Sequence, residues 1–428
     1  MTNVLREYTL NEVCPHCHED DAWIIIDEHV YDVTKFVSRH PGGKGPLLNL
    51  AGCDATDAFA NYHSAKVYAR MLPAFLIGKM APGEIVNPAH IQDFRNLRRQ
   101  MLQLGLFQTS TKYYVKLCVW YATLFATSLY LSLACTNALW RMCGAAVMGL
   151  FWQQLAGFGH DLGHSSVTCD FWKDHLIGSC LAALMGLSLS WWKIDHNSHH
   201  VVTNSLDRDP NVQHLPLLAI TDKILKNCFY DLYHKKWIIV DTVSRVLIAR
   251  QHIYFYPLML VARWNLYVQG ILHLIFSEEI VHFRKTEMFA IGIFFLWLFA
   301  LSFSMRTNAE AVCWLCVSHA VAGVLHVQIV LSHWALETYF GKPYGNDDWY
   351  LTALKTSQDI RTPAFFDWMH IGLQFQTAHH MFPRLPRHNL RIAQTMCKKV
   401  ARAHFADKSA DLFKRSDPYC EQSFARAN

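Results

Sequence analysis

The middle of the chain carries four long apolar runs that contain no lysine, arginine, aspartate or glutamate. Each has about the 18 to 24 residues that a helix needs to cross the hydrocarbon core of a membrane. Short polar turns separate the first run from the second and the third from the fourth, so each pair is predicted to form a hairpin that returns to its starting side. The runs are Leu117–Trp140, Met142–Gly159, Met288–Met305 and Ala311–Ser332.

Two other apolar runs, Leu176–Trp192 and Ile253–Ser277, are harder to place, because polar segments flank the first and Arg263 interrupts the second. A single crossing by either run would put the histidine-rich segments before and after it on opposite faces of the membrane. We therefore predict that both runs form helices that lie in the membrane interface or pack against it.

The two ends of the chain are more polar than its middle. The segment "AWIIIDEHVYDV" alternates and is rich in β-branched residues, which predicts strands, and Asp54–Met71 has a helical pattern. We predict four parts: a small α+β domain at 1–80, a linker at 81–110, an all-α integral membrane domain with about four transmembrane helices at 111–400, and a C-terminal tail at 401–428.

Composition agrees with a chain that combines soluble and membrane parts. Of the 428 residues, 52% are hydrophobic and 17% are charged, and the net charge of +5 is small and scattered, so nucleic-acid binding is not expected. The first residues show no secretory signal, so we expect the N-terminus, residues 160–286 and everything after 333 to be cytosolic. The thirteen cysteines form no disulfide framework and are expected to be free thiols.

A short motif near the N-terminus, Cys14-Pro-His-Cys17-His18, has the form of a covalent haem attachment site. That attachment belongs to exported proteins, and no export signal is visible. A zinc site and an ordinary surface loop are the alternatives, and we favour the surface loop.

Two further histidines form a candidate haem site. His40 opens the sequence His-Pro-Gly-Gly after a predicted strand, and His63 lies beyond a helical stretch. Two neutral imidazoles can bind an iron porphyrin from both sides and leave no position for oxygen. A lone His-Pro-Gly-Gly sequence can equally form a tight turn. The segment "WIIIDEHVYDVTKFVSRHPGG…LAGCDATDAFANYHSA" resembles a cytochrome b5 domain. This resemblance implies that His40 and His63 are axial ligands of a b-type haem.

Three histidine clusters occur in the polar parts of the membrane domain. Residues at i, i+3 and i+4 share one helix face, whereas adjacent residues diverge by about 100° and can reach two metals. One such cluster can be a solvated or packed group of histidines. Three clusters on the predicted cytosolic side of the membrane favour a metal site, and imidazole ligands suit iron, zinc or copper. The clusters are His160 and His164; His196, His199 and His200; and Gln376, His379 and His380, with the glutamine in or beside the ligand shell.

The order of a cytochrome b5-like segment, "HDLGH", "HNSHH" and "QTAHH" resembles the front-end branch of the membrane fatty-acyl and sphingolipid desaturases. The resemblance covers about residues 8–395 and implies two non-haem iron ions held by the cluster residues in a cytosolic cap. It also implies one more ligand just after the last membrane helix. We assign His333 to that place, with His326 as the alternative; otherwise His326 and His319 are expected to line the acyl tunnel or pack between helices.

By this resemblance the chain removes two hydrogens from a lipid chain with O2, using electrons from NADH that pass through cytochrome b5 reductase and the fused haem. It is expected in the endoplasmic reticulum membrane with both termini cytosolic. "GLQFQ" and "FPRLPRHNLR" look closer to sphingolipid delta-8 desaturases than to acyl delta-6 or delta-5 enzymes, so a sphingolipid long-chain base is the predicted substrate and a fatty acyl chain the alternative. A related di-iron lipid hydroxylase and a membrane haem electron carrier are the other classes considered.

Polar residues beside the clusters have candidate supporting roles. Asp161 and Asp195 each adjoin a cluster histidine, and a carboxylate that accepts the outer N–H of a metal-bound imidazole fixes its orientation; helix capping is the alternative. Arg384, Arg387 and His388 follow the third cluster. We predict that they lie near the polar head of the substrate, or else against lipid phosphate or the haem domain.

Overall fold

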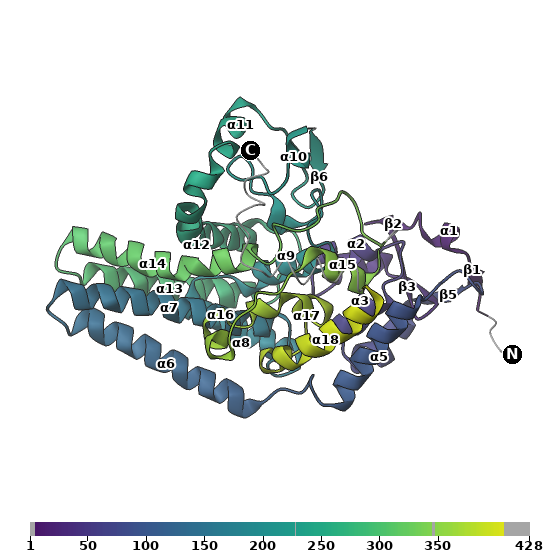
Figure 1. Ribbon diagram of the computed structural model, residues 1–428, viewed down its shortest axis with the longest axis horizontal. Coiled ribbons are helices and arrows are strands. Elements are labelled where there is room, and N and C mark those ends of the chain that lie inside the picture. Colours follow the sequence, from purple (N-terminus) through teal and green to yellow (C-terminus); the bar gives the residue numbers. More distant parts are fainter. Residues whose placement is uncertain (1–4, 227, 345–346, 406–428) are drawn as a thin grey trace.

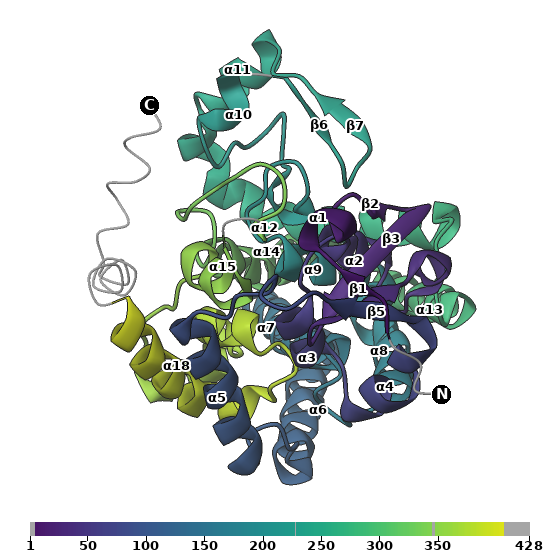
Figure 2. The ribbon, with the colours of Figure 1, turned by 90° about the vertical axis from the view of Figure 1, so that its right-hand side faces the viewer.

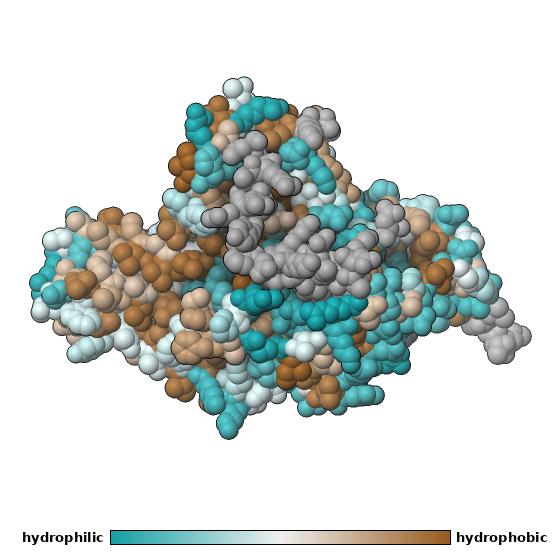
Figure 3. Space-filling view, in the orientation of Figure 1, coloured by the Kyte–Doolittle hydropathy of each residue, from teal (hydrophilic) through white to brown (hydrophobic). Residues whose placement is uncertain are grey.

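The computed structural model describes residues 5–226, 228–344 and 347–405. In Figure 1 a bundle of long helices extends to one side of a central cap, and a small α+β domain lies at the opposite end. Figure 3 shows hydrophobic side chains over much of the bundle, whereas the surface over the cap and the small domain is mostly hydrophilic. The predicted division into an α+β domain and an all-α membrane domain is confirmed.

The N-terminal domain is a five-stranded sheet, in the order β1-β5-β4-β3-β2, with helices packed on it. The predicted strand segment forms a hairpin of β3 (Asp21–Ile26) and β4 (His29–Asp32), whose turn residues Asp27 and Glu28 have positive φ angles. The β-branched residues of β3 favour the strand and are buried on both of its faces, Ile24 and Ile26 in one core cluster and Ile25 in another. In chain order the other elements are β1 (Glu7–Tyr8), α1 (Leu10–Val13), β2 (Cys17–His18), η1 (Thr34–Arg39), α2 (Lys44–Leu50), α3 (Thr56–Tyr62), α4 (Ala65–Arg70), η2 (Leu72–Phe75) and β5 (Leu76–Met80).

Much of the predicted linker at 81–110 is a helix. α5 (Ala89–Gln103) begins after Pro88 and packs against α18 (Leu390–His404), beside which it lies in Figure 2. A helical segment that joins two domains in this way is part of the core and not a spacer. Of the predicted tail at 401–428, only the residues up to 405 are described, and they complete α18. The apolar stripe that α5 buries consists of Ile91, Phe94, Leu97 and Met101.

The polar face of α5 holds the N-terminal domain in place. Arg95 donates two hydrogen bonds to the Asp57 carboxylate, from Nε at 2.9 Å and from Nη2 at 3.0 Å, and Arg98 Nε donates to the Asn61 side chain at 3.1 Å. Both acceptors lie on α3, which ends one residue before His63. The position of that histidine relative to the membrane domain therefore depends on α5.

The bundle contains the two predicted hairpins. α6 (Thr111–Leu133) and α7 (Ala138–Gly163) form the first, and α13 (Arg284–Phe303) and α14 (Asn308–Val330) form the second. The four helices run side by side in Figure 1, and α7 packs against both α6 and α14.

Among the described residues, four helices are long and apolar enough to cross a membrane, but they are not the four predicted runs. α12 (Gln251–Phe276) is one of them, together with α6, α13 and α14, whereas α7 is not. α7 is the inner helix of the bundle, and more than half of its residues are buried. Because protein surrounds it, it can carry buried polar side chains such as Gln153 and Gln154, which donate to carbonyl oxygens of α16 (Asp367–His370).

The predicted interfacial segment Ile253–Ser277 corresponds to α12, and both of its ends lie at the cap. Near its start Phe255 packs against Trp334, which follows α14. Beyond its end Arg284, the first residue of α13, donates to two carbonyl oxygens at the end of α12. α12 therefore begins and ends on the same side of the bundle, although its length would allow it to cross.

The other predicted interfacial segment, Leu176–Trp192, is a bent pair and not a single helix. α8 (Phe171–Met185) and α9 (Leu189–Val201) meet at an angle of 113°, and Gly186 between them has φ of +71°. A Cβ at Gly186 would lie 2.4 Å from the Phe294 ring, so the turn requires glycine. The pair enters the bundle and turns back, which returns α9 to the cap.

Short elements complete the cap on the bundle. They are η3 (Pro210–Val212), α10 (Lys223–Lys226), β6 (Phe229–Asp231), β7 (Lys236–Ile238), α11 (Thr242–Ile248), α15 (Trp349–Thr356), η4 (Ala364–Phe366), α16 (Asp367–His370), η5 (Leu373–Phe375), α17 (Gln376–Met381) and η6 (Arg387–Asn389).

An ion pair joins the two hairpins at the end of the bundle away from the cap. Arg141 Nη1 lies 3.3 Å from Glu310 Oε2, and both side chains are nearly buried. Loss of one partner from a buried pair leaves an uncompensated charge, at a cost of about 3–5 kcal/mol. We expect Arg141→Met to lower the apparent melting temperature of the detergent-purified chain, and the double variant with Glu310→Gln to recover most of that loss. Equal melting temperatures for the wild type and the single variant would contradict a stabilising role.

Candidate metal centre and haem cavity

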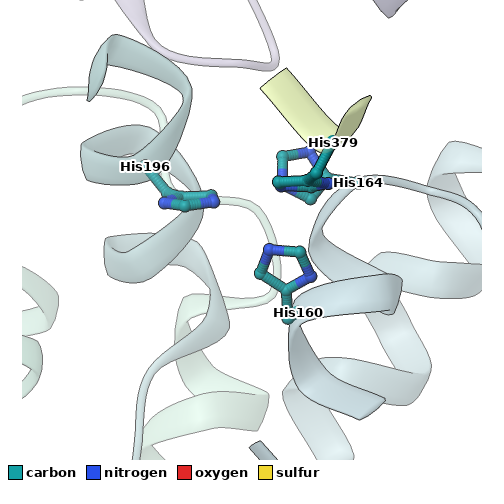
Figure 4. A group of neighbouring side chains, drawn as sticks. All are labelled: His160, His164, His196 and His379. Atoms are coloured by element: carbon teal, nitrogen blue, oxygen red, sulfur yellow. The ribbon is translucent and has the colours of Figure 1, made fainter. Parts of the chain in front are cut away.

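The histidines of the three clusters converge where α7, α9, α14 and α17 end at the cap. His333, just after α14, joins them. In each of two groups, one ring nitrogen from every histidine lies within 4.8 Å of the others. Figure 4 shows the rings of the first group around a common space. The first group is His160, His164, His196 and His379, and the second is His199, His333 and His380.

Two more cluster residues lie at the boundary between the groups. The Gln376 amide nitrogen is 3.0 Å from His333 Nε2 and 3.3 Å from His380 Nε2, which places it in the second group. His200 Nε2 lies 3.0 Å from the Nε2 atom of His196 and 3.1 Å from that of His379. Its ring also stacks on His380 of the second group, with centroids 4.0 Å apart. All the residues that the sequence assigned to the clusters are therefore brought together.

The chemistry of this donor set fits metal ions. Burial lowers the pKa of His200, His379 and His380 well below the ordinary value, so these rings are neutral, which is the form that binds a metal. Within the described part of the chain, both ring nitrogens of His164 and the Gln376 side-chain oxygen are buried without a hydrogen-bond partner. Buried polar atoms are costly unless they are paired, and a metal in each group would supply the partner.

Hydrogen bonds fix two rings of the second group from outside. His199 Nδ1 lies 2.9 Å from Asp209 Oδ2, and His333 Nδ1 donates to the Thr356 carbonyl oxygen at 2.8 Å. Asp209 lies after α9, at the start of η3. Each of these two hydrogen bonds leaves Nε2 of its ring for a ligand and fixes the plane of the ring.

The two aspartates proposed for this orienting role have other partners. The Asp195 carboxylate accepts from the Asn211 side chain at 3.1 Å, and no cluster ring is among its described hydrogen bonds. Asp161 lies 3.8 Å from His160 Nδ1, but its Oδ2 accepts from Arg387 at 2.9 and 3.1 Å. Asp209 therefore makes the carboxylate–imidazole contact predicted for Asp195, and Asp161 pairs with Arg387.

That ion pair also changes the prediction for the residues after the third cluster. Arg387 is buried and paired with Asp161, and it also lines a small pocket with His160 and His379. Arg384 lines the cavity between the two domains, which matches the alternative of a contact with the haem domain. His388 packs beside the Tyr113 ring, with centroids 4.9 Å apart.

The remaining histidines of α14 lie outside both groups. His326 Nδ1 is 3.1 Å from the carbonyl oxygens of Met259 and Gly323. His319 stacks on Trp264, with ring centroids 4.2 Å apart. Both pack between α12 and α14, so the geometry selects His333 over His326 as the additional member of the metal centre.

A second site lies between the N-terminal domain and the membrane domain, where a cavity has a volume of about 340 Å³. The rings of His40 and His63 face each other across it, with centroids 6.1 Å apart, which leaves room for one metal ion with bonds of about 2 Å. His40 Nδ1 donates to the Gly43 carbonyl at 2.7 Å and His63 Nδ1 to the Phe59 carbonyl at 3.1 Å, so Nε2 of each ring remains for a ligand. Burial lowers the pKa of His63 to about 3, which keeps it neutral.

The two sites are neighbours because the loop after His40 packs directly on α9. A Cβ at Gly43 would lie 2.9 Å from Ile194, and one at Gly45 would lie 2.5 Å from the Ser198 hydroxyl, so the glycines permit this close approach. His164 lines the cavity and also belongs to the first histidine group. The motif at Cys14 and Cys17 lines neither of the two described sites, and its second half, Cys17 and His18, forms strand β2.

Comparison with known proteins identifies relatives of both domains. The sequence family described as "Fatty acid desaturase" matches residues 137–407, and "Cytochrome b5-like Heme/Steroid binding domain" matches 9–81. "Delta(8)-fatty-acid desaturase 2" of Arabidopsis thaliana is 38% identical, over 93% of this chain and 88% of the relative. "Delta 8-(E)-sphingolipid desaturase" of Kluyveromyces lactis is 37% identical, over 86% of this chain and 65% of the relative. "Acyl-lipid (9-3)-desaturase" of Borago officinalis is 34% identical, over 100% of this chain and 92% of the relative. The predicted resemblance is confirmed.

The contrast between the two aspartates yields a test. Loss of a carboxylate that orients a metal-bound imidazole typically lowers metal affinity by about 10–100-fold. We expect Asp209→Asn to lower the non-haem iron content of the purified chain after dialysis against a weak chelator. Asp195→Asn, a matched change next to His196, should leave the iron content unchanged. Equal loss in both variants would assign the effect to general destabilisation of the cap.

Proposed function

The chain belongs to the fatty acid desaturase family, and we propose that it introduces a delta-8 double bond into a sphingolipid long-chain base. The observation that carries the proposal is the convergence of the three histidine clusters and His333 beside a cavity that presents two facing imidazoles. A membrane haem electron carrier would need only the cavity, and the two buried histidine groups would then have no role.

We propose that His40 and His63 hold a haem b, and that each histidine group holds one non-haem iron, with Gln376 beside the second. When bound, the haem supplies single electrons, and the two irons with O2 supply the chemistry that removes two hydrogens from an unactivated lipid chain. The cap excludes water from both groups, since most of their histidines are buried. Asp209 and the Thr356 carbonyl hold two of the rings in position, and accurate positioning is what makes one C–H bond reactive among many.

The substrate proposal draws on the names of the relatives and on the sequence after the third cluster. Two of the relatives carry delta-8 names, and the one from Kluyveromyces lactis is named for a sphingolipid. The relative from Borago officinalis is named for an acyl lipid, so a fatty acyl chain is the second candidate substrate. Of the three residues predicted near the head group, His388 is a candidate because its Nδ1 is buried without a partner among the described residues, and Arg387 is another because it lines a pocket beside the first histidine group.

We further propose that the chain lies in the endoplasmic reticulum membrane, with the cap and both termini in the cytosol, and that NADH-cytochrome b5 reductase supplies its electrons. The N-terminal domain and the cap lie at the same end of the bundle, as Figure 1 shows. That arrangement gives a reductase access to the haem domain from the same side of the membrane as the histidine groups.

The haem assignment predicts that His40→Ala and His63→Ala each abolish the b-type absorbance of the purified chain. Loss of one axial imidazole opens the haem iron and weakens its attachment, whereas the non-haem iron should stay bound because the cap is unchanged. His18→Ala, an exposed histidine of the same domain, is the matched control and should keep a normal spectrum. A normal reduced spectrum in both ligand variants would refute the assignment.

The substrate proposal predicts the lipid profile of a yeast that lacks such enzymes. Expression of the chain should produce delta-8-unsaturated long-chain bases and little change in fatty acids, both measured by mass spectrometry. His380→Ala should produce neither, because it removes a member of the second histidine group. New delta-6 or delta-5 fatty acids with unaltered long-chain bases would select the acyl substrate and leave the proposed metal centre intact.

A further inference from the structure

Two cations from the membrane domain line the cavity that His40 and His63 share. Lys193 projects from α9 and Arg384 follows the third cluster, and no aspartate or glutamate is among the described lining residues. The other lining side chains are mostly apolar, among them Phe36, Leu47 and Leu72 from the N-terminal domain. An otherwise apolar cavity thus carries positive charge on the wall that the membrane domain contributes.

Lys193 is the more unusual of the two, because its ammonium group is buried and forms no ion pair among the described residues. The residue is 4% exposed, and its Nζ has no hydrogen-bond partner within the described part of the chain. Its nearest aromatic contact is the Phe171 ring, whose centroid is 3.9 Å away. The Asp174 carboxylate accepts from the backbone N–H groups of Val167 and Thr168 and makes no hydrogen bond to Lys193.

A buried, unpaired ammonium is energetically costly, and burial lowers the pKa of Lys193 to about 7. Both cations line the same cavity as His40 and His63. The missing partner is therefore an anion that reaches both cations from the space between the two imidazoles.

We propose that Lys193 and Arg384 bind the two propionate carboxylates of the haem, so that the membrane domain completes the haem site. This inference rests on the proposed ligation by His40 and His63. Charge-assisted hydrogen bonds to a carboxylate are stronger than neutral ones, and the guanidinium can bind in a bidentate manner. With the haem bound, the N-terminal domain would be held to the cap through its cofactor as well as through α5.

The test measures haem loss from the purified full chain to excess apomyoglobin, followed by the Soret absorbance. Each preparation is reconstituted either with protohaem or with haem dimethyl ester, which lacks the two carboxylates. Lys193→Gln and Arg384→Gln are each expected to speed the loss of protohaem about tenfold, the usual scale for one charge-assisted hydrogen bond. The ester haem should leave the wild type and both variants at the same rate.

Matched controls separate this effect from general loss of charge or of folding. Lys35→Gln and Arg39→Gln remove exposed cations of the haem domain and should leave the loss of protohaem unchanged. Lys193→Arg keeps the charge and should restore slow loss. The non-haem iron content of each variant reports whether α9 and the third cluster remain folded.

Two results would overturn the inference. If the variants lose protohaem at the wild-type rate, the cations serve another anion, such as a lipid phosphate. If the variants lose protohaem and the ester haem faster than the wild type by the same factor, Lys193 and Arg384 act on the fold and not on the carboxylates. A wild-type chain with no Soret band would instead reject the ligation by His40 and His63, so the two failures are distinguishable.

Discussion

Buried imidazoles impose the constraint on which the rest of the fold depends. Neutral ring nitrogens inside a protein need a metal or a hydrogen-bond partner, and an apolar bundle could not satisfy the cluster histidines one by one. Their convergence requires α7, α9, α14 and α17 to meet at one end of the bundle. Every connection between the clusters must then leave the cap and return to it. The two hairpins, the bent pair α8–α9 and the path of α12 all meet this requirement.

The same end of the bundle receives the N-terminal domain. Because the loop after His40 packs on α9 and His164 lines the intervening cavity, the two candidate sites share a wall. α5 maintains this arrangement through its buried stripe and through Arg95 and Arg98. A donor held in this position is present at a high effective concentration, whereas a free carrier would have to dock for every electron.

Two side-chain contacts at the cap join residues that are not neighbours in the sequence. Asp195 adjoins His196 in the chain, but adjacent residues on a helix diverge by about 100°, so its carboxylate points elsewhere. Asp209 reaches His199 instead, because the segment after α9 folds back over the cluster. In the same way Arg387 pairs with Asp161 across 226 residues, and this contact is invisible in either local sequence.

The sequence by itself determined the order of the domains, the pairing of α6 with α7 and of α13 with α14, and the residues that gather at the cap. Helix length, hydrophobic period and residue type are local properties, so a single sequence displays them. Only the tertiary structure decided how the histidines divide into two groups, that His333 and not His326 completes the second, and that α7 lies inside the bundle while α12 begins and ends at the cap. It also decided that Lys193 and Arg384 complete the wall of the haem cavity. These outcomes depend on distances between side chains far apart in the chain, and a local pattern carries no information about such distances.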